Sequence, residues 1–110
     1  MRTINCWLTA ALIAIPMFAA PQKGKSARGE EIFQEQCSGC HGPDGRAQTE
    51  MAKKVQAADL TSDAVRSMST SQITKQVHQG KGKMPPFEGK LSDAEIRDVV
   101  AYVQALGKKQ

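Results

Sequence analysis

The sequence predicts an all-α domain behind an N-terminal export segment. No stretch alternates apolar and polar residues in the manner of a half-buried strand, and the clearest apolar pattern repeats at helical spacing. Glycines and prolines confine the remaining segments to turns and loops. The chain has 110 residues, which is enough for one small domain.

Residues 1–20 have the layout of a secretory signal peptide. Arg2 precedes an apolar run that ends in small residues at Ala20, and the run is too short to span a membrane comfortably. A cut after Ala20 leaves Phe18 at the third position back, which is not ideal, so an uncleaved N-terminal anchor is the alternative. We therefore expect a signal peptide or anchor at 1–20, a linker at 21–26 and the folded domain at 27–107.

The composition of the exported part indicates that something besides side chains fills its core. Its aromatic residues are Phe33, Phe87 and Tyr102 alone, and its two cysteines, Cys37 and Cys40, are too close in sequence for a disulfide to add much stability. Domains of this size usually need a disulfide, a metal or a cofactor. Arg2 is the only charge before residue 21, so the rest carries +3, with lysines scattered among acids. That distribution gives no prediction of nucleic-acid binding.

The first helices are expected between residues 26 and 80. One begins at a cap on Ser26, buries Ile32 and Phe33, and runs into the Cys37 region. A short helix is expected over 49–56, and Ser62 caps a single turn. The next helix begins at Thr70 or Ser71 and stops at Gly80, and the consecutive prolines after residue 84 make the following segment a loop.

The last helix is the clearest element. Ser92 and Glu95 form a capping-box pattern at its start, and Gly107 marks its end. The side chains expected on its buried face recur at helical spacing: Ile96, Val99, Val103 and Leu106.

The stretch "CSGCHG" at residues 37–42 has three interpretations. A thioredoxin-like redox pair needs a strand before its helix, and no strand is visible. A zinc site needs about four ligands, and only Cys37, Cys40, His41 and the distant His78 are available. The third interpretation is covalent haem attachment, since Cys-x-x-Cys-His binds haem through both thiols and directs the histidine at the iron. Export and the shortage of core material both favour haem c, one group covalently bound.

With this motif in place, the segment from about Ala27 to Leu106 resembles the small bacterial class I cytochromes c. The resemblance implies a cytochrome c fold in which Gly29 and Phe33 cross the last helix at Tyr102. In many relatives a proline carbonyl orients the haem histidine. This chain has "QAADL" at 56–60 where many relatives have "PPDL", so the carbonyl that orients His41 is left open.

The resemblance also implies the sixth iron ligand. The family places a methionine in a loop after the middle helix, and "GKGKMPPF" matches it, with Met84 as the ligand. Met51 and Met68 lack such a loop and are expected to fill core space. His78 is the alternative ligand, although its place at a polar helix end explains it without coordination.

Iron held by His41 and Met84 has no open position, so the predicted function is single-electron transfer, not enzyme catalysis. Exposed lysines around Met84, namely Lys75, Lys81, Lys83 and Lys90, are expected to steer acidic redox partners, although a generic solvated surface explains them equally well. The expected location is the periplasm, with membrane attachment only if residues 1–20 are retained. The alternatives are a subunit of a larger oxidoreductase, or an open-site haem peroxidase or gas sensor.

Overall fold

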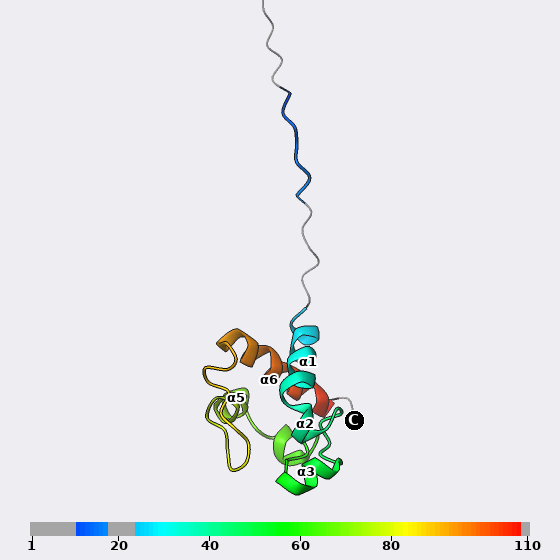
Figure 1. Ribbon diagram of the computed structural model, residues 1–110, viewed down its shortest axis with the longest axis vertical. Helices are drawn as coiled ribbons and strands as arrows, with labels where there is room; N and C mark the ends of the chain where they lie inside the picture. Colours follow the sequence, from blue (N-terminus) through cyan, green and yellow to red (C-terminus); the bar gives the residue numbers. More distant parts are fainter. Residues whose placement is uncertain (1–10, 18–23, 109–110) are drawn as a thin grey trace, which may run out of the picture.

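The computed structural model describes residues 11–17 and 24–108, and in these ranges the chain is helical with two isolated β-bridges and no sheet (Figure 1). The predicted all-α class is therefore confirmed. The helices are α1 (Lys25–Gln36), α2 (Ser38–His41), α3 (Glu50–Val55), α4 (Asp63–Arg66), α5 (Thr70–Gln79) and α6 (Asp93–Lys108).

The crossing of α1 and α6 organises the domain (Figure 1). At Gly29 a side chain would overlap the backbone carbonyl of Asp98, so only glycine allows the two helices this close approach. One turn further along α1, the fully buried ring of Phe33 lies 5.2 Å from that of Tyr102 in a tilted arrangement. The crossing that the resemblance implied is present.

Two groups of buried side chains flank this crossing. The first contains Ile32, Phe33, Val99, Tyr102, Val103 and Leu106. The second is smaller and contains Ile73, Ile96 and Val100. Leu91 packs against both groups, and the predicted buried face of α6 is confirmed.

Several helix boundaries differ from the sequence-based expectation. The predicted N-cap at Ser26 is wrong: Gly24 holds the cap position of α1, without a side-chain hydrogen bond, and Ser26 lies inside the first turn. The expected cap of α5 at Thr70 or Ser71 is also wrong, because Ser69 caps the helix in a capping box with Gln72.

The start of α6 and the stop of α5 agree with the sequence. The Ser92 hydroxyl accepts a hydrogen bond from the Glu95 backbone at 3.1 Å, and the Glu95 carboxylate accepts one from the Ser92 backbone. Gly80 is the C-cap of α5. Gly107, expected to end α6, is still helical and buried, because the aliphatic part of Arg66 lies against it.

The described part of the N-terminal segment does not pack on the domain. Residues 11–17 have no regular secondary structure, and their large apolar side chains are at least 82% exposed. The rest of the expected signal peptide, and linker residues 21–23, lie outside the described residues. Across residues 11–17 and 24–108, the chain forms no helix long and apolar enough to cross a membrane.

Candidate functional site

The "CSGCH" stretch forms a tight helical turn at the junction of α1 and α2. The backbone carbonyl of Cys37 accepts hydrogen bonds from Cys40 at 3.2 Å and from His41 at 2.9 Å. Gly42 ends the turn at a φ of 83°, in the region that favours glycine. The turn brings Cys37, Cys40 and His41 to the wall of one cavity.

That outer cavity has a volume of about 630 Å³. Its other walls include residues 55–58 at the end of α3 and just beyond it, and residues 81–85 after α5, with Phe87 buried beside them. A smaller inner cavity of about 70 Å³ is lined mainly by apolar side chains of the core. The residues that line both cavities are Cys37, His41, Ala58, Gln76 and Met84.

The imidazole of His41 is oriented by a backbone carbonyl. Its Nδ1 lies 2.9 Å from the carbonyl oxygen of Ala58, so Nδ1 carries the proton in the neutral ring and Nε2 keeps its lone pair for a metal. The segment that contains Ala58 is held in place two residues further on, where the Leu60 backbone N–H donates to the Gly45 carbonyl at 2.8 Å. Ala58 therefore does what a proline does in many relatives, and the carbonyl of Pro43 is engaged by Gln34 instead.

Met84 stands at the end of a tight turn. The backbones of Lys81 and Met84 exchange two hydrogen bonds, of 2.9 and 3.1 Å. The loop then returns to α5, where the Phe87 N–H donates to the Val77 carbonyl at 3.0 Å. Met84 is half-buried and lines both cavities, and the next residue, Pro85, is exposed. The proline and the hydrogen-bonded turn make this backbone stiff, and the stiff backbone holds the thioether at both cavities.

Comparison with known proteins identifies the family. The model of the family described as "Cytochrome C oxidase, cbb3-type, subunit III" matches residues 24–103, which is most of the chain. The chain belongs to the cytochrome c family. It therefore carries haem c, which is bound covalently.

The relatives of this cytochrome include several cytochromes c6 and a subunit of a cytochrome c oxidase. Cytochrome c6 of Synechocystis is 36% identical over 77 residues, which cover 70% of this chain and 62% of that protein. The cbb3-type oxidase subunit FixP of Bradyrhizobium diazoefficiens is 34% identical over 84 residues, 74% of this chain but 28% of that protein. A solved structure of cytochrome c6 from the diatom Phaeodactylum tricornutum matches with a TM-score of 0.62 and 32% identity, covering 78% of this chain and 98% of the other.

The residues around the cavities fit a covalently bound haem. Two free thiols, one imidazole with an available Nε2 and one thioether sulfur line the outer cavity together. These are the donors that attach haem c and bind its iron in cytochromes. The apolar residues of the inner cavity, such as Val65 and Val99, suit the porphyrin's apolar surface.

The redox-pair and zinc interpretations lack support in the cytochrome. Burial, with a smaller effect of Cys40, raises the pKa of the Cys37 thiol to about 11, which disfavours the redox pair, because the reactive form of a redox cysteine is the thiolate. Among the described residues no group of three or more His, Cys, Asp or Glu side chains could hold a metal ion.

The other candidate iron ligands lie away from both cavities or serve the core. His78 lines neither cavity, and its Nε2 lies 3.7 Å from a carboxylate oxygen of Asp93. Met68 lines the inner cavity as expected of a core residue. The expectation that Met51 fills the core is wrong, because it is 49% exposed on the short helix α3, which buries only Ala52.

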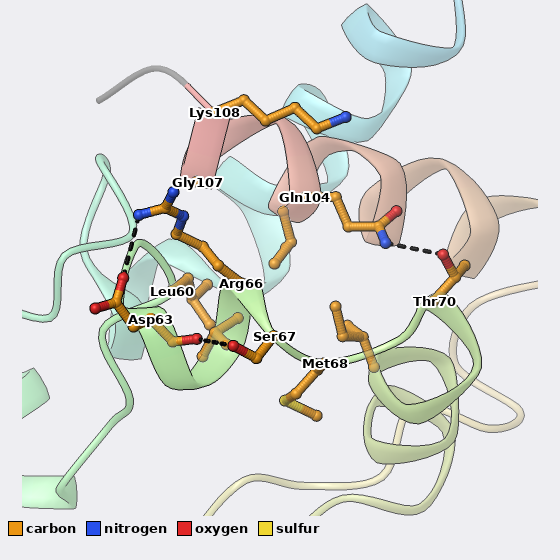
Figure 2. A pocket seen from close by; sticks show the side chains of 12 residues that line it. Leu60, Asp63, Arg66, Ser67, Met68, Thr70, Gln104, Gly107 and Lys108 are labelled. Atoms are coloured by element: carbon orange, nitrogen blue, oxygen red, sulfur yellow. Dashed lines mark hydrogen bonds and ion pairs between the residues drawn. The ribbon is translucent and has the colours of Figure 1, made fainter.

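A third cavity, of about 690 Å³, lies between α4, the start of α5 and the end of α6 (Figure 2). Its polar groups bond to one another: Arg66 pairs with Asp63 at 3.2 Å, and Gln104 donates to the Thr70 hydroxyl at 2.8 Å. No cysteine or histidine lines it. Its apolar lining, which includes Leu60, also borders the inner cavity. The two cavities therefore share a wall of apolar side chains.

Proposed function

We propose that this cytochrome is a mono-haem carrier that passes single electrons between redox proteins outside the cytoplasmic membrane. In this proposal Cys37 and Cys40 form the thioether bonds, and His41 and Met84 bind the iron. The observation that carries it is the fixed imidazole: His41 Nδ1 is held by Ala58 at a cavity that Met84 also lines.

The bound haem supplies reversible one-electron chemistry between ferrous and ferric iron. Bound by both His41 and Met84, the iron would have no open position for oxygen or peroxide, which favours carrier function over catalysis. A thioether is a soft donor that stabilises the ferrous state and raises the potential. Apolar side chains such as Val65, Ile73 and Val99 line the inner cavity, and an apolar surrounding of this kind leaves little solvent to reorganise when the charge of the iron changes.

Export is part of the proposal. The N-terminal segment has the pattern of a signal peptide, and its described part stays clear of the domain. Covalent haem attachment takes place outside the cytoplasm in bacteria, which agrees with a periplasmic location. Retention of residues 1–20 would tether the carrier to the membrane instead.

The acceptor and donor are proposed to be acidic at their docking surfaces. Lys75, Lys81, Lys83 and Lys90 are all exposed, and Lys81 and Lys83 line the outer cavity. The Lys83 ammonium donates to the Lys54 backbone carbonyl at 3.3 Å, which brings α3 with its lysines to the same rim. Positive charge around a haem edge steers acidic partners, and the effect weakens with salt.

The test is the optical spectrum of haem-loaded protein, reduced, with and without carbon monoxide. A low-spin c-type spectrum that carbon monoxide leaves unchanged is the expected result. A spectrum that shifts would refute the closed site and favour the peroxidase or gas-sensor alternative. Protein recovered without haem would refute the assignment of Cys37 and Cys40.

A second candidate is a subunit of a larger oxidoreductase. It is favoured by the family model, whose description names an oxidase subunit, and by the similarity to FixP. The discriminating measurement is purification from the native membrane and periplasmic fractions followed by a salt wash. A carrier comes free of its partners at high ionic strength, whereas a subunit stays with one complex.

A further inference from the structure

Gly80 ends α5 in a conformation that only glycine adopts readily. Its φ is 71° and its ψ is 175°, a combination that strains the backbone of any residue with a side chain. Its N–H donates to the Gln76 carbonyl at 2.8 Å and so completes the last turn of the helix. The chain then enters the turn that ends at Met84.

The backbone of the Met84 loop returns to lie directly against Gly80. A Cβ atom at position 80 would stand 2.5 Å from the Met84 carbonyl oxygen, and 2.8 Å from both Pro85 C and Pro86 N. All three are backbone atoms, so no rotation of a side chain relieves the overlap. The Met84 carbonyl also accepts a hydrogen bond from the Lys81 N–H, so the contact reaches the turn itself.

The loop has few ways to absorb a displacement at this point. Beyond the two prolines, the Phe87 and Glu88 N–H groups donate to the carbonyls of Val77 and His78, at 3.0 and 3.2 Å. The end of the loop is therefore fixed to α5, the same helix that ends at Gly80. Pushing the segment outward at Gly80 moves Met84 relative to the cavities that it lines.

We propose that Gly80 is a positioning residue for Met84: the absence of a side chain at position 80 sets how deeply the thioether reaches into the haem cavity. The inference rests on the proposed function, because it assumes that Met84 binds iron. In this proposal Gly80 contacts neither the thioether sulfur of Met84 nor the iron, and it acts through the backbone of the loop that carries Met84.

The test compares Gly80→Ala with Gly89→Ala in haem-loaded protein. Gly89 lies beyond Phe87 at a φ of 81° and lines neither cavity, and a Cβ there meets nothing within 4 Å, so this variant carries the cost of a positive φ without the overlap. The readouts are the thioether-to-ferric-iron charge-transfer band, carbon monoxide binding and the midpoint potential. We expect Gly80→Ala to lose the band, bind carbon monoxide and fall in potential, whereas Gly89→Ala keeps the wild-type values.

Met84→Ala provides the second comparison. If Gly80 acts through Met84, then adding Gly80→Ala to Met84→Ala changes neither carbon monoxide binding nor potential further. Equal effects of Gly80→Ala and Gly89→Ala, or an unchanged band in Gly80→Ala, would overturn the proposal. Failure of Gly80→Ala to load haem would also overturn it, because a role confined to Met84 leaves attachment at Cys37 and Cys40 intact. A wild-type protein without the band refutes the proposed function instead.

Discussion

The close approach of α1 to α6 at Gly29 makes Gly29→Ala an informative substitution. Gly29 lies in α1 with helical neighbours, so alanine fits the local backbone and by propensity alone stabilises a helix by about 1 kcal/mol. The added methyl, however, would overlap the Asp98 carbonyl and stand 2.9 Å from the Tyr102 Cβ. At this position the helix propensity of alanine therefore stabilises the fold, whereas the overlap with α6 destabilises it.

The tertiary effect is the larger one. An extra methyl group in a well-packed core costs about 1–3 kcal/mol, and the upper end applies here because a backbone carbonyl cannot rotate away. Separating α1 from α6 by about 0.5–1 Å also forfeits a quarter to a half of each dispersion contact across the interface, including those of Phe33 and Tyr102. Net of propensity, we expect a loss of about 2 kcal/mol, or about 8–16 °C in Tm.

The assay is denaturant unfolding of haem-loaded protein, followed by far-ultraviolet circular dichroism and haem absorbance. Gly39→Ala is the matched control, since Gly39 is helical, exposed and has no atom within 4 Å of its would-be Cβ. The control should unfold at the wild-type midpoint or slightly above it. A Gly29→Ala protein as stable as the control would refute the close-crossing argument.

Two further predictions concern the haem and the lysine rim. Replacing Cys37 and Cys40 by alanine prevents covalent attachment, and without haem the apolar side chains of the inner cavity lose the group that would cover them, in a domain whose whole stability is about 5–15 kcal/mol. Circular dichroism should therefore show reduced helix, and cooperative unfolding of that variant at the wild-type midpoint would contradict this expectation. Lys83→Glu should slow electron exchange with an acidic redox protein at low salt and match wild type near 1 M salt, where screening is nearly complete. Lys108 lies away from the outer cavity, so Lys108→Glu should change the rate of electron exchange little. Equal slowing by both variants would exclude a docking surface confined to the lysines around the outer cavity.

Features that depend on near neighbours could be predicted from the sequence. The turn at residues 37–42 closes through hydrogen bonds between residues three and four apart, and the Ser92–Glu95 box spans one helical turn. The buried face of α6 follows from spacing alone, since Ile96, Val99 and Val103 recur at helical period. Helix caps were harder to predict. Ser69, Thr70 and Ser71 all suit the N-cap of α5, and moving the helix start by one residue changes which of them is the cap.

The sequence by itself determined the class of this protein, because the haem-attachment motif consists of specific side chains that are close together in the sequence. The tertiary structure decided which groups support it. The carbonyl that holds His41 comes from Ala58, 17 residues away, and every residue has a carbonyl, so no residue type marks the one that is used. Gly80 likewise looks like an ordinary helix stop until the loop returns against it. Contacts of this kind join residues that are distant in the sequence, so the local sequence pattern does not predict them.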